Sequence, residues 1–401
     1  MRHARLLGFV AASALALTAG AARAEDTVKI GFTTALTGPF NEFGEGVHRG
    51  VVLAMEKWNA AGGINGHKVE LAELLDDQLI PDRSVQNLRR ILDNKDIVAI
   101  LAPSGSGPTL AVVDMVQADG RPMCNPQAQT PSIVYPNGLD KPPRPNVFSI
   151  TIQNNVEAEK MADVLAKKFT KIGLLHESTG YGVTGAKLLK EEILKRNKNA
   201  KITQESYNQR DQDMTAQLVR MQRAGDEVLM VIGLGADMAV NRKNMSRLNM
   251  NIPRYGSAGT VTQPFIEGAG DLAEGQRAVN FLFASADPMR PATKEFADAY
   301  KAKYGVDRWW GPDASRPQAS MAGTVASGYD CANLLFDAIR RANSTKPADI
   351  DKAMEATNKY PGAIIDQTFT PAKHNSVGPD DLVLYEFVKK DGRMQLVPTQ
   401  E

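Results

Sequence analysis

The sequence has few of the residues that hold metals or act as thiol nucleophiles: two cysteines and five histidines among 401 residues. The histidines show no HExxH or related ligand spacing, and Cys124 and Cys331 form no CxxC pair. We therefore expect neither a metal nor a cofactor. In an oxidising compartment the two cysteines allow one disulfide, although two buried thiols fit the sequence equally well.

An excess of positive charge is also absent, since 47 Lys and Arg residues face 46 Asp and Glu residues. A chain without a basic surplus offers no electrostatic footprint for nucleic acid, so we expect no such partner. The sequence also lacks the GxSxG elbow of α/β-hydrolases and the Gly-Lys-Ser/Thr of a P-loop. These absences remove the commonest sequence signatures of hydrolases and NTPases.

Long hydrophobic runs are absent beyond the N-terminus. There, Arg2 and Arg5 precede an apolar run over 6–17, and Ala22-Arg23-Ala24 follows. This order is typical of a cleaved secretory signal peptide, predicted over 1–24, and the run is too short to span a bilayer. A lipoprotein would need a cysteine near the cleavage site, and the sequence has none there. The mature chain, with a charge of about −2 after loss of three arginines, is expected in the periplasm.

The rest of the chain alternates short β-rich runs with amphipathic helical segments. Such alternation predicts parallel sheets covered on both faces, and more than about ten strands favour two doubly wound α/β lobes over one sheet. We predict strands over 28–33, 69–75, 97–102, 171–175, 201–206 and 227–232, and helices over 44–61, 82–93, 109–118, 157–169, 183–195, 214–224, 236–248 and 319–342.

Two segments show no periodic apolar pattern. Residues 131–145 contain several prolines and are predicted to form a surface loop before the chain crosses to the second lobe. A long loop after Tyr300 carries Trp309 and Trp310, which we interpret as packing residues and not as a binding box.

A serine-rich turn, Ser104-Gly105-Ser106-Gly107-Pro108, follows a predicted buried strand and precedes a helix. Pro108 suits the first helical turn, and free amides at a helix N-terminus favour a carboxylate or similar anion. In open parallel sheets, ligands bind beyond the carboxyl ends of the strands, where this turn lies. A plain strand-to-helix turn capped by a hydroxyl is the alternative.

The segment 180–185 reads Gly-Tyr-Gly-Val-Thr-Gly, with Glu205 twenty residues beyond its last glycine. It matches the GxGxxG fingerprint and supports an alternative function, an exported NAD(P)-dependent enzyme. Against that reading, the motif follows its strand after a spacer and lies mid-chain in an exported protein. Tyr181, at a helix start, would instead offer a ring and a hydroxyl to a ligand.

The neighbouring carboxylates Asp76 and Asp77 are compatible with a metal or paired-acid site. We favour a structural role, in which they cap the loop before Pro81.

These motifs occur together with several others in a fixed order: Ile30-Gly31, Thr37-Gly38-Pro39, Phe43-Gly44, Asn-Ala-Ala-Gly-Gly-Ile-Asn-Gly over 59–66, and Gly328-Tyr329-Asp330. From Val28 to about Tyr385 the chain resembles the leucine/isoleucine/valine-binding protein family, periplasmic receptors for ABC transporters. The resemblance covers most of the chain.

The resemblance implies a type I periplasmic binding protein, with two lobes joined by a three-crossing hinge. The first lobe would comprise 25–148 and 284–362, and the second 149–283 and 363–401. A disulfide between Cys124 and Cys331 would then lie within the first lobe. The protein would be a monomer that closes on a small ligand, catalyses nothing and docks on a membrane permease. A ligand sensor on the same scaffold remains an alternative.

The family's ligand site falls on residues from both lobes. The resemblance implies that the ligand carboxylate is held by the serine turn, that an aromatic residue lines the pocket, and that a tyrosine of the second lobe closes over the ligand. The corresponding residues are Ser104, Gly105, Ser106, Gln127, Ala128, Gln129, Phe43 and Tyr181.

Two departures concern the ligand's ammonium group. Where family members have a hydroxyl in the first lobe, this chain has Gln129, with Thr130 one step along. No carboxylate occurs near 256–259, where the second lobe should supply one. Because an unpaired buried ammonium costs several kcal/mol, the ligand need not be an α-amino acid. The resemblance implies a branched-chain or other hydrophobic amino acid, and the two departures leave a related small carboxylate or amide open.

Overall fold

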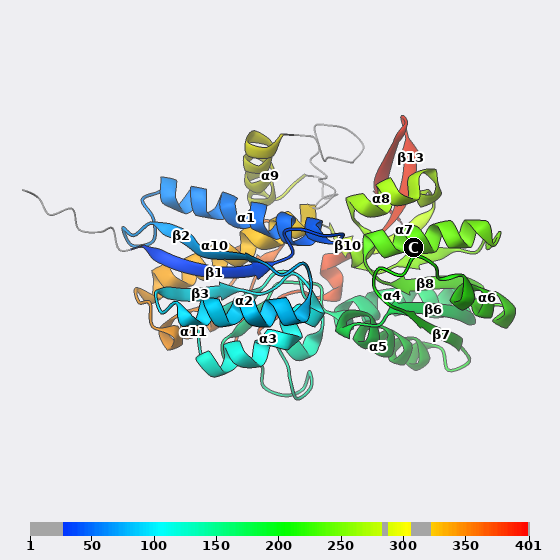
Figure 1. The fold of residues 1–401 in the computed structure, drawn as a ribbon, viewed down its shortest axis with the longest axis horizontal. Coiled ribbons are helices and arrows are strands. Elements are labelled where there is room, and N and C mark those ends of the chain that lie inside the picture. The colour runs from blue at the N-terminus through cyan, green and yellow to red at the C-terminus, as the bar shows by residue number, and fades with distance from the viewer. Residues whose placement is uncertain (1–26, 283–287, 306–321, 400–401) are drawn as a thin grey trace, which may run out of the picture.

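The computed structural model describes residues 27–282, 288–305 and 322–399. It forms two halves that lie side by side along the long axis (Figure 1), each built on its own sheet. We call the half with the five-stranded sheet the first lobe and the half with the seven-stranded sheet the second lobe. The predicted signal peptide, Trp309 and Trp310 lie outside the described residues.

The sheet of the first lobe is parallel throughout, in the order β2-β1-β3-β4-β5. Helices α1 and α10 cover one face, and α2 and α3 cover the other. Its elements are β1 (Val28–Thr34), α1 (Asn41–Ala60), β2 (Val69–Asp76), α2 (Pro81–Asp93), β3 (Ile97–Leu101), α3 (Ser106–Asp119), β4 (Met123–Asn125), β5 (Val147–Ser149), α9 (Pro291–Tyr304), α10 (Ala322–Ala342), α11 (Pro347–Glu355), β11 (Tyr360–Pro361) and β12 (Asp366–Gln367).

The sheet of the second lobe has the order β14-β13-β10-β9-β8-β6-β7. From β7 to β10 it is parallel and repeats the strand order of the first lobe, with β6 in the place of β1. Its elements are α4 (Asn154–Lys168), β6 (Lys171–Glu177), α5 (Gly180–Arg196), β7 (Lys201–Tyr207), α6 (Thr215–Ala224), β8 (Val228–Ile232), α7 (Gly235–Arg247), β9 (Arg254–Gly256), α8 (Gln263–Ala269), β10 (Gln276–Phe281), β13 (Leu382–Lys390) and β14 (Arg393–Pro398).

Both faces of each parallel sheet are apolar, as the sequence pattern indicated. On β6, Leu174 packs in the core beneath α4 and α5, and its neighbour Leu175 packs in the core beneath α6 and α7. Successive side chains of a strand point to opposite faces, so a run of buried leucines requires helices on both sides. The predicted doubly wound α/β fold is confirmed.

Helices α1 and α10 pack unusually close because glycines remove side chains from their interface. A Cβ at Gly50 would lie 2.0 Å from the Val325 carbonyl oxygen, and one at Gly328 would lie 2.2 Å from that of Val47. The disulfide between Cys124 on β4 and Cys331 then fixes α10 to the sheet. This bond settles the question of pairing that composition left open, and both cysteines are fully buried.

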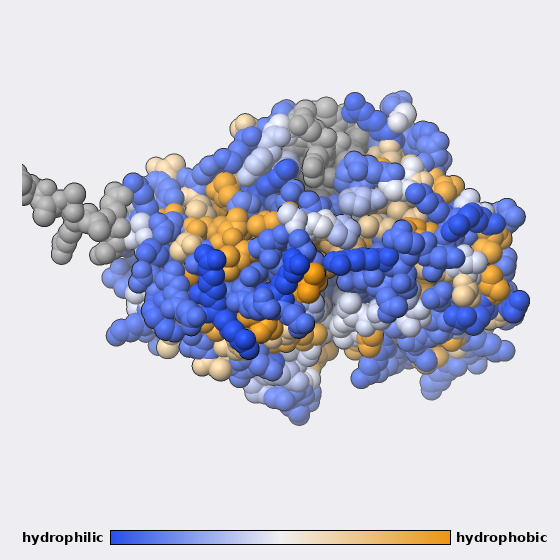
Figure 2. Space-filling view, viewed as in Figure 1, coloured by the Kyte–Doolittle hydropathy of each residue, from blue (hydrophilic) through white to orange (hydrophobic). Residues whose placement is uncertain are grey.

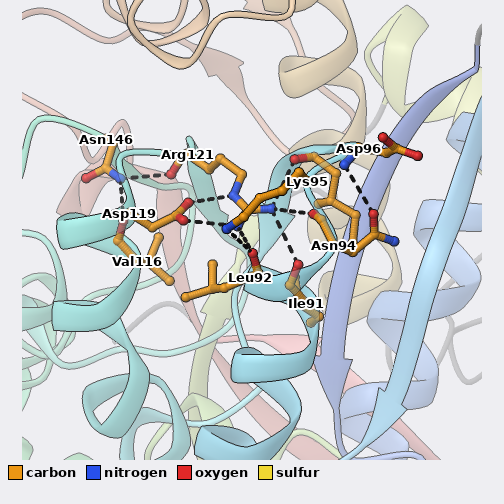
Figure 3. A network of polar contacts seen from close by, with 10 residues as sticks. Ile91, Leu92, Asn94, Lys95, Asp96, Val116, Asp119, Arg121 and Asn146 are labelled. Carbon is orange, nitrogen blue, oxygen red and sulfur yellow. Dashed lines mark hydrogen bonds and ion pairs between the residues drawn. The ribbon is translucent and has the colours of Figure 1, made fainter.

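A buried arginine stabilises the end of the first lobe that lies opposite the cleft, where β3 begins. Arg121 donates to carbonyl oxygens at the end of α2 and the start of β3, including Leu92 at 2.8 Å and Asn94 at 2.9 Å (Figure 3). Its charge is balanced by Asp119, with Nε to Oδ1 at 2.5 Å. A cation at the C-terminus of a helix complements the helix dipole, so this contact stabilises α2.

The chain crosses between the lobes three times: from β5 to α4, from β10 to α9, and before β13. Ser149 pairs with Asn375, so the first and third crossings lie side by side. The predicted surface loop over 131–145 is only partly exposed. Ile133, Val134 and Tyr135 are buried in the core beneath α3, which an aperiodic segment of the sequence could not reveal.

The sequence pattern missed the antiparallel hairpin β13–β14, which extends the second sheet. Its turn is Asp391-Gly392, and both residues have positive φ. Asp-Gly is a preferred dipeptide for tight hairpin turns, so a usable signal was present.

We predict that the Cys124–Cys331 disulfide contributes about 2–4 kcal/mol to the free energy of unfolding, as is typical of native disulfides. Denatured, unreduced protein should titrate with no free thiol. The double variant Cys124→Ala/Cys331→Ala should lose that stability in urea unfolding. Two titratable thiols before reduction, or an unchanged unfolding midpoint, would contradict the prediction.

Candidate functional site

A pocket of about 1320 Å³, solvent at its mouth included, lies between the two lobes. Figure 2 shows a mostly hydrophilic outer face, whereas the pocket lining is mainly apolar. Most of the lining comes from loops after parallel strands of both sheets, where ligands bind in folds of this kind, and the rest comes from α1, α10 and the hairpin β13–β14. It consists of Phe43, Leu79, Pro81, Ser104, Gly105, Ser106, Gly107, Pro108, Pro126, Gln127, Gln129, Thr151, Ile152, Thr179, Tyr181, Gln209, Leu234, Ala258, Gly259, Val261, Asn280, Phe281, Gly323, Thr324, Tyr385 and Leu396.

The serine turn forms the start of α3, as predicted, and its two hydroxyls have fixed partners. The Ser106 Oγ atom accepts hydrogen bonds from the backbone N–H groups of Gln129 at 3.1 Å and Thr130 at 3.2 Å. The Ser104 Oγ atom accepts from the Thr34 hydroxyl at 2.8 Å. A hydroxyl has one hydrogen and two acceptor positions, so Ser106 keeps its hydrogen to donate, and Ser104 does so as long as the Thr34 hydroxyl donates to it.

Tyr181 lies in the first turn of α5, which begins at Gly180 and is longer than predicted. Its side chain is buried on the pocket wall, and the hydroxyl makes no hydrogen bond of ordinary geometry with the described residues. Burial, together with the nearby carboxyl of Glu157, raises the pKa of Tyr181 well above its usual value. The hydroxyl therefore stays protonated and is a donor for a ligand.

The GxGxxG segment does not form a phosphate-binding loop, because its residues are helical. A Cβ at Gly182 would lie 2.2 Å from the Glu177 carbonyl oxygen, so this glycine serves helix–strand packing. Glu205, the acid expected to bind a ribose, instead forms an ion pair with Arg220, with both oxygens at 2.7 Å. The exported-enzyme alternative is therefore not favoured.

Three buried carboxyls brace the loops on the second-lobe side of the pocket. Glu157 accepts from the backbone N–H of Ala258 at 2.6 Å, and Glu177 accepts from that of Gly182 at 3.0 Å and from the Thr179 hydroxyl. Asp237 accepts from the backbone N–H of Arg210 at 3.1 Å. Burial raises the pKa of Glu157 and of Asp237 to about 7 and also raises that of Glu177.

Asp76 and Asp77 brace the first-lobe side in the same way, which confirms the predicted capping role. Asp76 accepts from the backbone N–H groups of Leu36 at 2.9 Å and Gln78 at 3.0 Å. Asp77 accepts from that of Leu79 at 2.9 Å. Among the described residues no cluster of three or more Asp, Glu, His or Cys side chains could hold a metal ion.

All the site residues expected from the sequence lie on the pocket wall except Ala128. Both backbone groups of Ala128 bond to the Asn125 side chain, at 2.9 and 2.7 Å, which turns this residue into the core. Thr130, considered as a hydroxyl for the ligand, donates to the Gly180 carbonyl oxygen across the lobes at 3.1 Å. The Ala128 contact is local, three residues along the chain, whereas the Thr130 contact is a tertiary one that the local sequence does not encode.

The sequence reasoning missed most of the second-lobe wall. Gln209 follows β7, Leu234 follows β8, and Ala258 and Gly259 follow β9. The position of each after a predicted or observed parallel strand is the signal that could have found them. The reasoning also missed Glu157, which brings a carboxyl to 256–259 from a helix about a hundred residues earlier in the chain.

The lobes touch beside the pocket as well as around it. Arg210 of the second lobe donates to the Gln78 carbonyl oxygen at 3.2 Å and lies 5.6 Å from the centre of the Phe40 ring. With the Thr130–Gly180 bond, these contacts hold the lobes together on both sides of the serine turn. The arrangement is that of a closed clamp.

Glu157 gives a test of the bracing role through pH. Its pKa rises from 4.5 to about 7 on folding, so the stability linked to its protonated form is complete below about pH 4.5 and is lost as pH rises through about 7. Glu157→Gln keeps an acceptor for the N–H of Ala258 but does not titrate. We therefore expect the free energy of unfolding of the variant to fall less between low and high pH than that of wild type, by up to about 3 kcal/mol.

The measurement is urea unfolding of wild type and variant at pH 5 and pH 8. Glu191→Gln, an exposed position on α5, is the control. Parallel pH profiles for wild type and Glu157→Gln would contradict the assignment.

No helix in the described part of the chain is long and apolar enough to cross a membrane. Known structures and curated proteins include relatives that match this chain over most of its length. A crystal structure of a type 1 periplasmic binding protein from Bordetella pertussis Tohama I has a TM-score of 0.89, with 53% identity over 93% of this chain and all of that one.

Among curated proteins, Leu/Ile/Val-binding protein homolog 3 of Brucella melitensis is 30% identical over 75% of this chain and 78% of its own. The leucine-, isoleucine-, valine-, threonine- and alanine-binding protein of Pseudomonas aeruginosa is 24% identical over 88% of each chain. The sequence profile of a family described as periplasmic binding protein matches residues 27–393. The chain therefore belongs to the periplasmic binding protein family.

Proposed function

We propose that this protein is an extracytoplasmic solute-binding protein that closes on a small ligand and delivers it to an ABC importer. The observation that carries the proposal is a pocket whose walls come from the strand ends of two separate lobes. A ligand that contacts both walls stabilises the closed form over the open one, which is the requirement for ligand-driven closure. The protein itself catalyses no reaction.

We propose a first lobe of about 25–148 and 284 onward, and a second lobe of 149–283 and the C-terminal segment. The expected change of lobe at 362 is too early, because the backbone N–H groups of Ala363 and Ile364 contact Asp330 on α10 and Asn375 still pairs with Ser149. We therefore propose a third crossing between Asn375 and β13. A cleaved signal peptide over 1–24 would deliver the chain to the periplasm, where it acts as a monomer and docks on a membrane permease.

In the proposed site, Ser104 and Ser106 donate to an acidic group of the ligand, with the amides of Gly105 and Gly107 at the start of α3 beside them. Gln127 and Gln129 complete the polar part of the first-lobe wall. Phe43 supplies apolar surface, and Tyr181 closes from the second lobe. The curated names of the relatives support a hydrophobic amino acid, or a related small carboxylate or amide, as the ligand.

We expect Ser106→Ala and Tyr181→Phe each to lower affinity about 10- to 100-fold, because a hydrogen bond to a charged group contributes about 1.5–3 kcal/mol. The ligand is first found by a thermal-melting screen of amino acids, amides, benzoate and hydroxybenzoates, since a ligand at about a hundred times its Kd adds roughly 2.7 kcal/mol. Affinity is then measured by calorimetry.

Ser246→Ala, which removes a hydroxyl from an exposed position on α7, is the matched control and should bind like wild type. Unchanged affinity in both Ser106→Ala and Tyr181→Phe would show that the ligand binds elsewhere. Failure of every compound in the panel to shift the melting temperature would count against small-ligand binding itself.

A further inference from the structure

We infer that the ligand is a carboxylate with an apolar body and no ammonium group, so that any further polar group it carries is neutral. This inference rests on the proposed function and concerns the same pocket. It follows from how the hydrogen-bonding capacity and the charges of the wall are distributed.

Ser106 indicates where the carboxylate of the ligand binds. Both acceptor positions of its Oγ atom are filled by backbone N–H groups, those of Gln129 and Thr130. A backbone N–H cannot reverse its role, so the Ser106 hydroxyl can only donate. Ser106 is also the first residue of α3, where the helix dipole favours negative charge. This point of the wall therefore requires an acceptor and repels a cation.

Tyr181 adds a second donor, which lies beside the Ser257 side chain and the backbone N–H of Gly259. The residue is 6% exposed, lines the pocket, and its hydroxyl makes no ordinary hydrogen bond with described residues. Leaving a buried hydroxyl unsatisfied costs about 1–3 kcal/mol, so a ligand acceptor there is favoured. Ser104 contributes a third donor if the Thr34 hydroxyl keeps its role as donor to Ser104.

An ammonium has no matching counter-charge on this wall. None of the described residues that line the pocket is Asp, Glu, Lys, Arg or His. Of the described lining residues, Gln129 has a side-chain oxygen that is buried without a partner, and that amide is neutral. A neutral acceptor suits a hydroxyl or an amide N–H, whereas a buried ammonium without a paired charge carries a penalty of several kcal/mol.

The carboxyls behind the second-lobe wall do not supply the missing charge at the pocket surface. Glu157, Glu177 and Asp237 are at most 3% exposed and lie outside the lining. Each has one oxygen committed to a backbone N–H of a wall loop. Their arrangement accounts for the shape of the wall, and it does not require a cationic ligand.

The test compares amino acids with acids of the same carbon skeleton in which hydrogen or a neutral oxo group replaces the ammonium. Leucine is paired with 4-methylpentanoate and 4-methyl-2-oxopentanoate, and phenylalanine with 3-phenylpropanoate, by calorimetry and thermal melting of the mature wild-type protein. We expect the deaminated acid of at least one pair to bind roughly 100-fold tighter than its amino acid. 3-Phenylpropanamide and 4-methylpentanamide, which lack the negative charge, should bind more weakly than the acids.

Tighter binding of an amino acid than of its deaminated partner would overturn the inference and leave the proposed function intact. Loss of that amino-acid binding in Glu157→Gln would then identify Glu157 as the counter-charge. Preference for the amides over the acids would also overturn the inference alone. If no acid, amino acid or amide shifts the melting temperature, both the inference and the proposed function fail.

Discussion

The loops around the cleft depend on buried and partly buried carboxyl groups that accept hydrogen bonds from irregular backbone. Beyond the strand ends no sheet partner satisfies the N–H groups, and a buried N–H must be paired. Asp76 and Asp77 do this on the first lobe, and Glu157, Glu177 and Asp237 do it on the second. The pocket keeps its shape through these bonds, while the lining that a ligand meets stays uncharged over the described residues.

The two lobes contribute differently to the pocket. On the first lobe, the serine turn presents donors at a helix start, fixed by backbone N–H groups of the next loop. On the second lobe, Tyr181 stands on a helix whose first turn is held by Glu177. In the proposed function, the first wall binds the acidic group of the ligand, and the second is a braced surface that meets it on closure. Arg210 and Thr130 join the walls beside the ligand space.

The fold was largely predictable because alternating apolar runs and helical stripes leave few other topologies. The strand after Lys171 and the helix after Pro81 were found within a few residues of their observed bounds. The sequence did not reveal the burial of Ile133 to Tyr135, because aperiodic segments owe their burial to distant partners. The hairpin at Asp391-Gly392 was missed although its turn signal was present.

The site was predictable where a motif sits at a strand end, as at Ser104, Ser106 and Tyr181. It was not predictable where a residue's role comes from a contact across the fold, as for Glu157 with Ala258 or Thr130 with Gly180. Helix starts and turns can be predicted from local sequence, whereas the loops that face the pocket are determined by contacts between distant segments.

The most direct test of the account is a crystal structure of the mature protein with the tightest ligand from the screen. The account predicts a closed molecule with a ligand carboxylate oxygen about 2.5–2.7 Å from Ser106 Oγ, the usual length of a hydroxyl–carboxylate hydrogen bond. The Tyr181 hydroxyl should contact the same ligand from the other lobe. A ligand that contacts only one lobe, or that places an ammonium at Ser106, would contradict the account.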